Sequence, residues 1–150
     1  MLTAALAVFA TAAPAAQAQA PVPDASIRGF VADYFRAVEA GDPSGILALV
    51  DEEFVIKWPI GQPISDREVL RQALATMRQR VRQEIRWQVL EAHVHGDWAW
   101  ARVAETATHH PRTAGGPTRT LDGSHLMILR KRGGRWLLHR DYGALNAMPK

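Results

Sequence analysis

The order of hydrophobic patterns along the chain is the feature that most restricts its fold. Apolar residues recur at helical spacing within residues 26–41 and 65–81, whereas the stretch from residue 84 to residue 143 has the pattern of successive strands. Helices followed by a run of strands are typical of α+β proteins, because the helices then cover one face of an antiparallel sheet. A chain of 150 residues suits one such domain, which we place at residues 26–146.

Three helices are predicted in the first part of the chain. The first should end at Gly41, and Asp42 followed by Pro43 is the expected start of a second, short helix. The sequence SDRE, from Ser65 to Glu68, has the form of a capping box and predicts the start of a third helix. Residues expected on buried helix faces are Ile27, Phe30, Val31, Tyr34 and Val38 in the first helix, and Leu70, Leu74, Met77 and Val81 in the third.

Five strands are predicted, within residues 52–61, 84–95, 98–110, 124–132 and 135–143. Tight turns are expected at residues 96–97 and 133–134, and residues 111–123 are expected to form a long polar loop. Side chains alternate along a strand, so the last strand should divide into two sets. One set, expected to face the interior, is Leu137, His139 and Asp141; the other is Trp136, Leu138, Arg140 and Tyr142.

Residues 34–61, YFRAVEAGDPSGILALVDEEFVIKWPIG, are similar to the opening of ketosteroid isomerases. In those enzymes a tyrosine on the first helix is followed by A-G-D, by G-I and A-L, and by an acidic turn and a strand that ends in Pro and Gly. Over about residues 26–146 the chain resembles the nuclear transport factor 2-like superfamily, which includes ketosteroid isomerases and SnoaL-like polyketide cyclases. The resemblance implies a cone-shaped α+β barrel, in which the helices and a strongly curved, mostly antiparallel sheet enclose an apolar pocket.

The resemblance also bears on individual positions. Tyr34 falls at the oxyanion-binding tyrosine of ketosteroid isomerases, but Trp58 falls at their catalytic aspartate and His125 near their second acid. The isomerase mechanism is therefore not expected, because its pair of acids is missing. The last strand, GRWLLHRD, instead resembles that of SnoaL-like cyclases, which implies that Asp141 is the acid–base group, with His139 two residues before it.

We expect Asp141, His139 and Tyr34 to be the catalytic residues. A carboxyl group in an apolar cavity tends to have a raised pKa and can exchange protons, while His139 could hold a carbonyl and Tyr34 could donate to an enolate. This is proton transfer beside a carbonyl, as in isomerisation, cyclisation or dehydration, on a small apolar or carbonyl-containing molecule and without metal or cofactor. The side chains expected to bind the ligand are Trp58, Met77, Trp100 and His125.

Two alternatives remain open. The pocket could bind a ligand without turnover, or the domain could be a dimeric interaction module with a vestigial pocket. Asp141 would then be a structural partner of Arg140, His125 or a backbone amide. Residues 109–110, both histidine, are expected to be exposed where the long loop begins.

The partners expected from charge and patterning are few. The formal net charge is +3, from 18 basic and 15 acidic residues, and no basic patch with interleaved aromatics appears, so nucleic-acid binding is not expected. The last two strands are apolar on both faces, although a small cone buries only one, which predicts a homodimer.

The first twenty residues carry no charge and resemble a secretory signal peptide. An apolar run over residues 2–13 precedes an A-x-A site at residues 16–18, so we expect a signal peptide over residues 1–18 and a mature chain that begins at Gln19. The run is too short to be a stable membrane anchor. The protein is therefore expected to be exported, to the periplasm or the medium; it has no cysteine and forms no disulfide.

Overall fold

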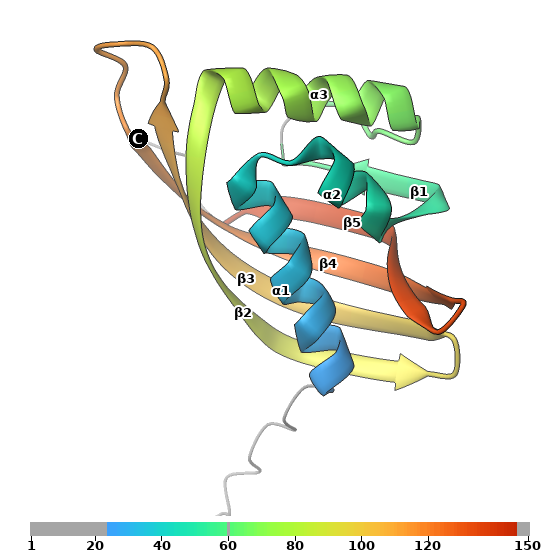
Figure 1. Ribbon diagram of the computed structural model, residues 1–150. Helices are drawn as coiled ribbons and strands as arrows, with labels where there is room; N and C mark the ends of the chain where they lie inside the picture. The colour runs from blue at the N-terminus through green and yellow to red at the C-terminus, as the bar shows by residue number, and fades with distance from the viewer. Residues whose placement is uncertain (1–23, 60, 147–150) are drawn as a thin grey trace, which may run out of the picture.

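The computed structural model describes residues 24–59 and 61–146 (Figure 1). The elements are α1 (Ala25–Ala40), α2 (Pro43–Leu49), β1 (Val50–Lys57), α3 (Arg67–Arg80), β2 (Val81–His95), β3 (Trp98–Pro111), β4 (Arg119–Arg132) and β5 (Arg135–Leu145). The predicted α+β class is confirmed. The signal peptide expected at residues 1–18 lies outside the described residues.

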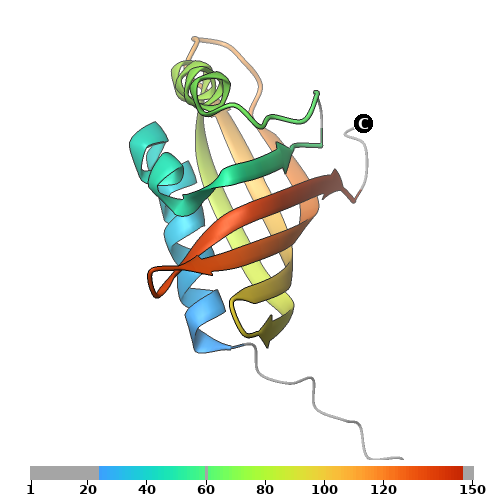
Figure 2. The same cartoon turned by 90° about the vertical axis from the view of Figure 1, so that its right-hand side faces the viewer.

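The five strands form one curved, open sheet in the order β1-β5-β4-β3-β2. β1 runs parallel to β5, and the other neighbouring pairs are antiparallel. The long strands bend around α1, which lies in their hollow, while α3 lies across one end of the molecule (Figures 1 and 2). This curvature leaves room for a cavity between the helices and the inner sheet face. No helix in the described part of the chain has the length and apolar character needed to cross a membrane.

The predicted end of α1 and the predicted start of α2 are confirmed, but the predicted start of α3 is not. Gly41 ends α1 in the left-handed conformation with φ 58°, and the Asp42 side chain accepts a hydrogen bond from Ser44 N at 3.1 Å. The N-cap of α3 is Asp66 rather than Ser65, so the predicted capping box is wrong by one residue. The Asp66 carboxylate accepts from both Glu68 N (2.8 Å) and Val69 N (2.9 Å), which satisfies two free amides at once.

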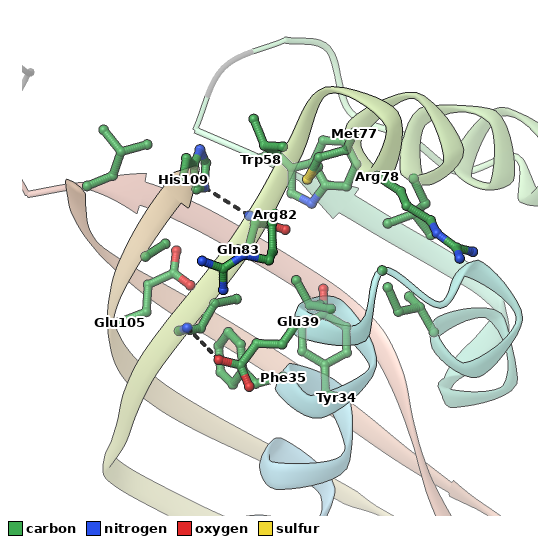
Figure 3. Close-up of a pocket in the computed structure, with 18 of the residues that line it drawn as sticks. Tyr34, Phe35, Glu39, Trp58, Met77, Arg78, Arg82, Gln83, Glu105 and His109 are labelled. Atoms are coloured by element: carbon green, nitrogen blue, oxygen red, sulfur yellow. Dashed lines mark hydrogen bonds between the residues drawn. The ribbon is translucent and has the colours of Figure 1, made fainter. Parts of the chain in front are cut away.

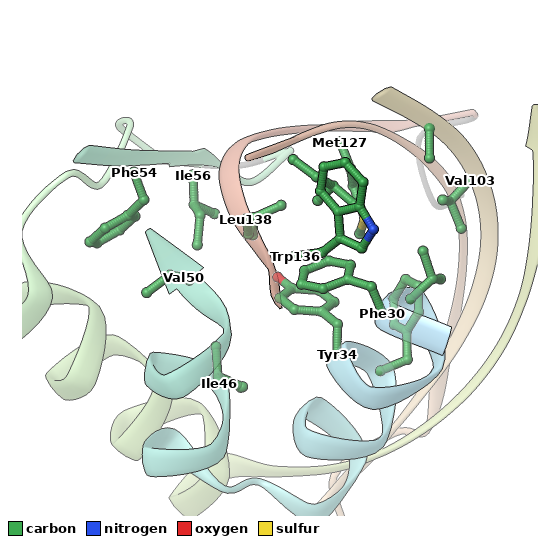
Figure 4. Close-up of a cluster of buried hydrophobic side chains, with 14 of the residues drawn as sticks. Phe30, Tyr34, Ile46, Val50, Phe54, Ile56, Val103, Met127, Trp136 and Leu138 are labelled. Carbon is green, nitrogen blue, oxygen red and sulfur yellow. The ribbon is translucent and has the colours of Figure 1, made fainter. Parts of the chain in front are cut away.

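A bulge in β5 overturns the predicted alternation of that strand. Leu138 pairs with Leu129 and Arg140 pairs with Ile128, so His139 is an extra residue between them. One extra residue shifts the phase of the side chains that follow it. Trp136 and Leu138 are therefore buried before the bulge (Figure 4). Asp141 is buried after it.

The strand β4 begins earlier than the sequence predicts. Residues 119–123 were expected in a loop, but they pair with β3 as far as His109. Threonine and aspartate side chains hold this polar end of the hairpin: Thr106 Oγ1 donates to Asp122 Oδ1 at 2.7 Å, and the hydroxyls of Thr108 and Thr120 lie 3.3 Å apart. These cross-strand bonds replace apolar packing, which is why the pattern of residues 119–123 is that of a loop.

Candidate functional site

A largely apolar cavity of about 270 Å³ lies between α1, α3 and the inner face of β2, β3 and β4 (Figure 3). Its apolar wall includes Phe35, Val38, Ile46, Trp58, Leu74, Met77, Ile85, Ala107, Leu121 and Leu145. Nine polar or charged residues also line the cavity. They are Tyr34, Glu39, Arg78, Arg82, Gln83, Glu105, His109, Arg112 and His125.

Four titratable side chains at the inner end of this cavity are joined by hydrogen bonds and an ion pair. His125 Nδ1 lies 2.8 Å from Asp141 Oδ1, and His125 Nε2 lies 3.0 Å from Glu105 Oε1. Tyr34 Oη donates a longer hydrogen bond, of 3.5 Å, to Asp141 Oδ2. The side chain of Asp141 is 1% exposed and that of Glu105 is 17% exposed. Asp141 thus lies behind His125, while Glu105 reaches the cavity.

The two carboxylates decide the charge of His125. Burial by itself would lower the pKa of this imidazole, but the hydrogen bonds and charges of Asp141 and Glu105 raise the pKa to about 10. His125 is therefore an imidazolium at neutral pH. Burial, together with the charges of Asp141 and Glu105, raises the pKa of Tyr34 well above its ordinary value, so its hydroxyl keeps its proton and can donate.

The structure brings together four of the seven side chains expected at the site and places a fifth directly behind them. Tyr34, Trp58, Met77 and His125 line the cavity. Asp141 is completely buried and contacts two residues of the set, Tyr34 and His125. Asp141 is not an isolated acid, since its partner is the His125 cation.

The position predicted for His139 is wrong. Because of the bulge, its ring lies away from the cavity, where Nδ1 is 3.0 Å from Asp51 Oδ2 and the ring packs edge-on against Trp98. Asp51 is buried and is also bound by Arg132 at 3.0 Å. Burial would raise the pKa of Asp51, but hydrogen bonds from the Glu52 amide, His139 and Arg132 hold it below its ordinary value. His139 therefore completes a separate ion-pair cluster.

The position predicted for Trp100 is also wrong. Trp100 stacks on His93 with ring centroids 4.6 Å apart and lines a shallow groove on the outer sheet face, together with Trp98, Leu126 and Ile128. Strand alternation explains the difference, because Ala99, Ala101 and Val103 on β3 are buried against the helices and Trp100 points the other way.

Gln83, Glu105 and His109, three of the polar residues that line the cavity, are not among the site residues that the sequence predicts. Extending the buried face of β3 from Val103 by alternation to 105, 107 and 109 would have found two of them. The sequence instead predicts an exposed His109, because the expected strand ends at residue 110. Gln83 was missed because β2 was expected to begin only at residue 84, whereas it starts at Val81.

Comparison with known proteins places this geometry in a family. The sequence profile of the SnoaL-like domain matches residues 31–139. A conserved protein from Planctomyces limnophilus superposes with a TM-score of 0.74 at 26% identity, covering 80% of this chain and 93% of that one.

Two further solved structures share the fold. A ketosteroid isomerase-like protein from Erwinia carotovora atroseptica has a TM-score of 0.75 at 21% identity, covering 83% of this chain and 96% of its own. A candidate scytalone dehydratase from Novosphingobium aromaticivorans has a TM-score of 0.75 at 18% identity, covering 81% and 83%. No curated protein matches the sequence.

Proposed function

The chain belongs to the SnoaL-like domain family, and we propose that its cavity binds a small, largely apolar organic molecule and moves a proton beside a carbonyl group of that molecule. One observation carries this proposal. A buried carboxylate–imidazolium–carboxylate chain ends at Glu105, whose carboxylate meets an apolar cavity of a size suited to a small ring system.

Glu105 is the base in this proposal. Its carboxylate takes a proton from the carbon next to the carbonyl, the electron pair of the C–H bond moves toward the carbonyl oxygen, and an enolate forms. Tyr34 keeps its proton, and in this proposal its hydroxyl donates to the enolate oxygen in place of its long hydrogen bond to Asp141 Oδ2. The protonated Glu105 then returns the proton to the same or another carbon, which gives exchange or isomerisation.

Asp141 acts through His125 and is a positioning residue. It does not line the cavity, and its Oδ1 is bound by His125. By holding one nitrogen of the imidazolium, Asp141 fixes the ring so that the other nitrogen orients Glu105. The role that the resemblance implied for Asp141 is thus divided in our proposal, with proton transfer assigned to Glu105 and orientation to Asp141.

Ligand binding without turnover is the second candidate function. Both nitrogens of His125 are already bound by carboxylates, and the Tyr34 hydroxyl already has an acceptor. Such a satisfied network also occurs where polar residues only stabilise a pocket.

Deuterium exchange separates the two candidates without knowledge of the natural substrate. The purified protein is incubated with 1-tetralone in D2O, and loss of the α-proton signal is followed by NMR. We expect wild type to exchange these protons faster than buffer and Glu105→Gln to reduce that rate by about a hundredfold or more. Glu91→Gln, an exchange of a carboxylate on β2 outside the cavity lining, is the control and should keep the rate. If 1-tetralone bound to the protein but its α-protons exchanged no faster than in buffer, the role of Glu105 as a base would be contradicted. Ligand binding without turnover would then be the supported function.

We also propose that the protein is a homodimer formed through the outer sheet face. Trp98 (42% exposed), Leu126 (43%) and Tyr142 (46%) present aromatic and aliphatic surface there, on neighbouring strands β3, β4 and β5. A second copy of the same face is the proposed partner, because an apolar patch can pair with itself across a twofold axis.

Export is proposed from the sequence of the first twenty residues alone. N-terminal sequencing of the protein from a cell fraction outside the cytoplasm should find Gln19 at or near the start, whereas a full-length chain confined to the cytoplasm would contradict export.

A further inference from the structure

We propose that His109 and Gln83 form a second polar subsite in the cavity, which binds an acceptor oxygen, such as an ether or carbonyl oxygen, at the end of the ligand remote from Glu105. The inference rests on the proposed function for the presence of a ligand, and it adds the class of that ligand. The ligand would be an elongated apolar molecule with a carbonyl group at one end and a second acceptor oxygen at the other.

His109 and Gln83 lie opposite each other on two neighbouring strands. They are register partners of β3 and β2, both line the cavity, and their Nε2 atoms lie 2.9 Å apart (Figure 3). Neither side chain takes part in the chain of Asp141, His125 and Glu105. The pair is therefore a separate polar feature in a mainly apolar wall.

The contact between the two nitrogens defines the state of the His109 ring. The amide nitrogen of Gln83 can only donate, so His109 Nε2 accepts and the ring proton is on Nδ1. A doubly protonated ring would place two donors against each other. Burial also lowers the pKa of His109, in spite of the opposing charge of Glu105, which agrees with a neutral ring at neutral pH.

A neutral His109 with its proton on Nδ1 has one hydrogen bond left to give. Nδ1 has no partner within residues 24–59 and 61–146, although the ring is half-buried. A half-buried donor gains more from an acceptor oxygen than a solvated one does, because water competes less for it. The free Nδ1–H therefore favours a ligand that brings an acceptor oxygen to this part of the cavity.

The spacing along β3 sets the length of the ligand. Glu105 and His109 are four residues apart on one face, so their Cα atoms lie about 13 Å apart. Ala107, the small residue between them, also lines the cavity and leaves space for a flat apolar body. A fused ring system with oxygens at opposite ends matches this arrangement, since both side chains line the same cavity and stand on the same face of β3.

Two isosteric ketones test the subsite by binding alone. The probes are 6-methoxy-1-tetralone and 6-ethyl-1-tetralone, which differ in the ether oxygen at the end away from the ketone, and their affinities are measured by NMR titration. We expect wild type to prefer the methoxy compound by roughly fivefold, the effect of one neutral hydrogen bond. In His109→Phe and in Gln83→Leu this preference should disappear while the affinity for the ethyl compound changes little.

The matched control is His110→Phe, one residue along the same strand and outside the cavity lining, which should keep the preference. A second readout is the imidazole 15N spectrum, in which His109 should be protonated on Nδ1 and its signals should shift with the methoxy ligand only.

Equal affinity of wild type for the two ketones, or a preference that survives His109→Phe, would contradict the proposed subsite. Because these are binding measurements, a Glu105→Gln protein without exchange activity should still show the preference, so the two proposals fail separately. If neither ketone bound, the pocket itself would be contradicted.

Discussion

At the residue scale, His125 is the side chain whose surroundings most restrict its chemistry. It is buried, yet it carries a positive charge, because Asp141 and Glu105 bind its two nitrogens. Such a buried pair is costly to break, since the remaining ion is left without a partner in a poorly solvated place. The same contacts that stabilise the fold here also orient Glu105, which lines the cavity.

Removing the charge of Asp141 tests this coupling. We expect Asp141→Asn to lower the free energy of unfolding by roughly 3 kcal/mol, because the His125 cation loses its buried partner. Urea denaturation measures the change, and Asp97→Asn, at an exposed position in the β2–β3 turn, is the control and should have little effect. If Asp141→Asn left stability unchanged or raised it, Asp141 would be an isolated acid and not a partner of His125.

The raised pKa of His125 makes stability depend on pH above neutrality. The pKa is about 10 in the folded protein and about 6.5 in an unfolded chain, so the charged ring favours folding fully below pH 6.5, and this contribution is lost as the pH rises toward 10. Between pH 7 and pH 10 the free energy of unfolding of wild type should fall by up to roughly 1.4 kcal/mol per pH unit more than that of His125→Gln. Parallel pH profiles for the two proteins would show that His125 is not charged in the fold.

At the element scale, helix α3 closes the cavity with Leu74 and Met77, so its start affects the site as well as stability. Asp66 caps the helix through two backbone amides, and Ser65 does not. Asp66→Ala should cost about 1 kcal/mol of unfolding free energy, while Ser65→Ala should cost much less. Thermal and urea unfolding of the two variants measure these losses. A larger loss of unfolding free energy for Ser65→Ala than for Asp66→Ala would show that Ser65 is the N-cap, as the sequence predicts.

The bulge in β5 decides which residues of that strand are buried. It places Leu138 and Asp141 inside the molecule on the two sides of His139, although three positions separate them. A regular strand cannot bury both, because positions of opposite parity face opposite ways. The bulge thus allows an apolar anchor and a buried carboxylate to follow each other on the same inner face.

At the scale of the whole molecule, the outer sheet face should decide the oligomeric state. Sedimentation velocity at micromolar concentration should show a dimer for wild type and a monomer for Leu126→Glu, because a charge in the centre of the apolar patch opposes burial. Val69→Glu, on the exposed side of α3, is the matched control and should remain dimeric. A wild-type monomer under these conditions would contradict the proposed interface.

The sequence by itself determined the order of elements, the end of α1 and the start of α2, and it placed Tyr34, Trp58, Met77 and His125 at the cavity that they line. These features depend on local pattern, on turn and capping chemistry, and on a resemblance that spans most of the domain. Predictions of this kind stay correct even when the predicted start or end of a strand is wrong by a few residues.

Only the tertiary structure decided which side chains meet. The pairing of β4 with β5 introduces the bulge that sends His139 to Asp51 and keeps Asp141 inside. The pairing of β3 with β4 brings Glu105 to His125, and that of β2 with β3 brings Gln83 to His109. These contacts depend on strand register over long sequence separations, where a shift of one residue reverses every side chain, and alternation within a single strand contains no information about such a shift.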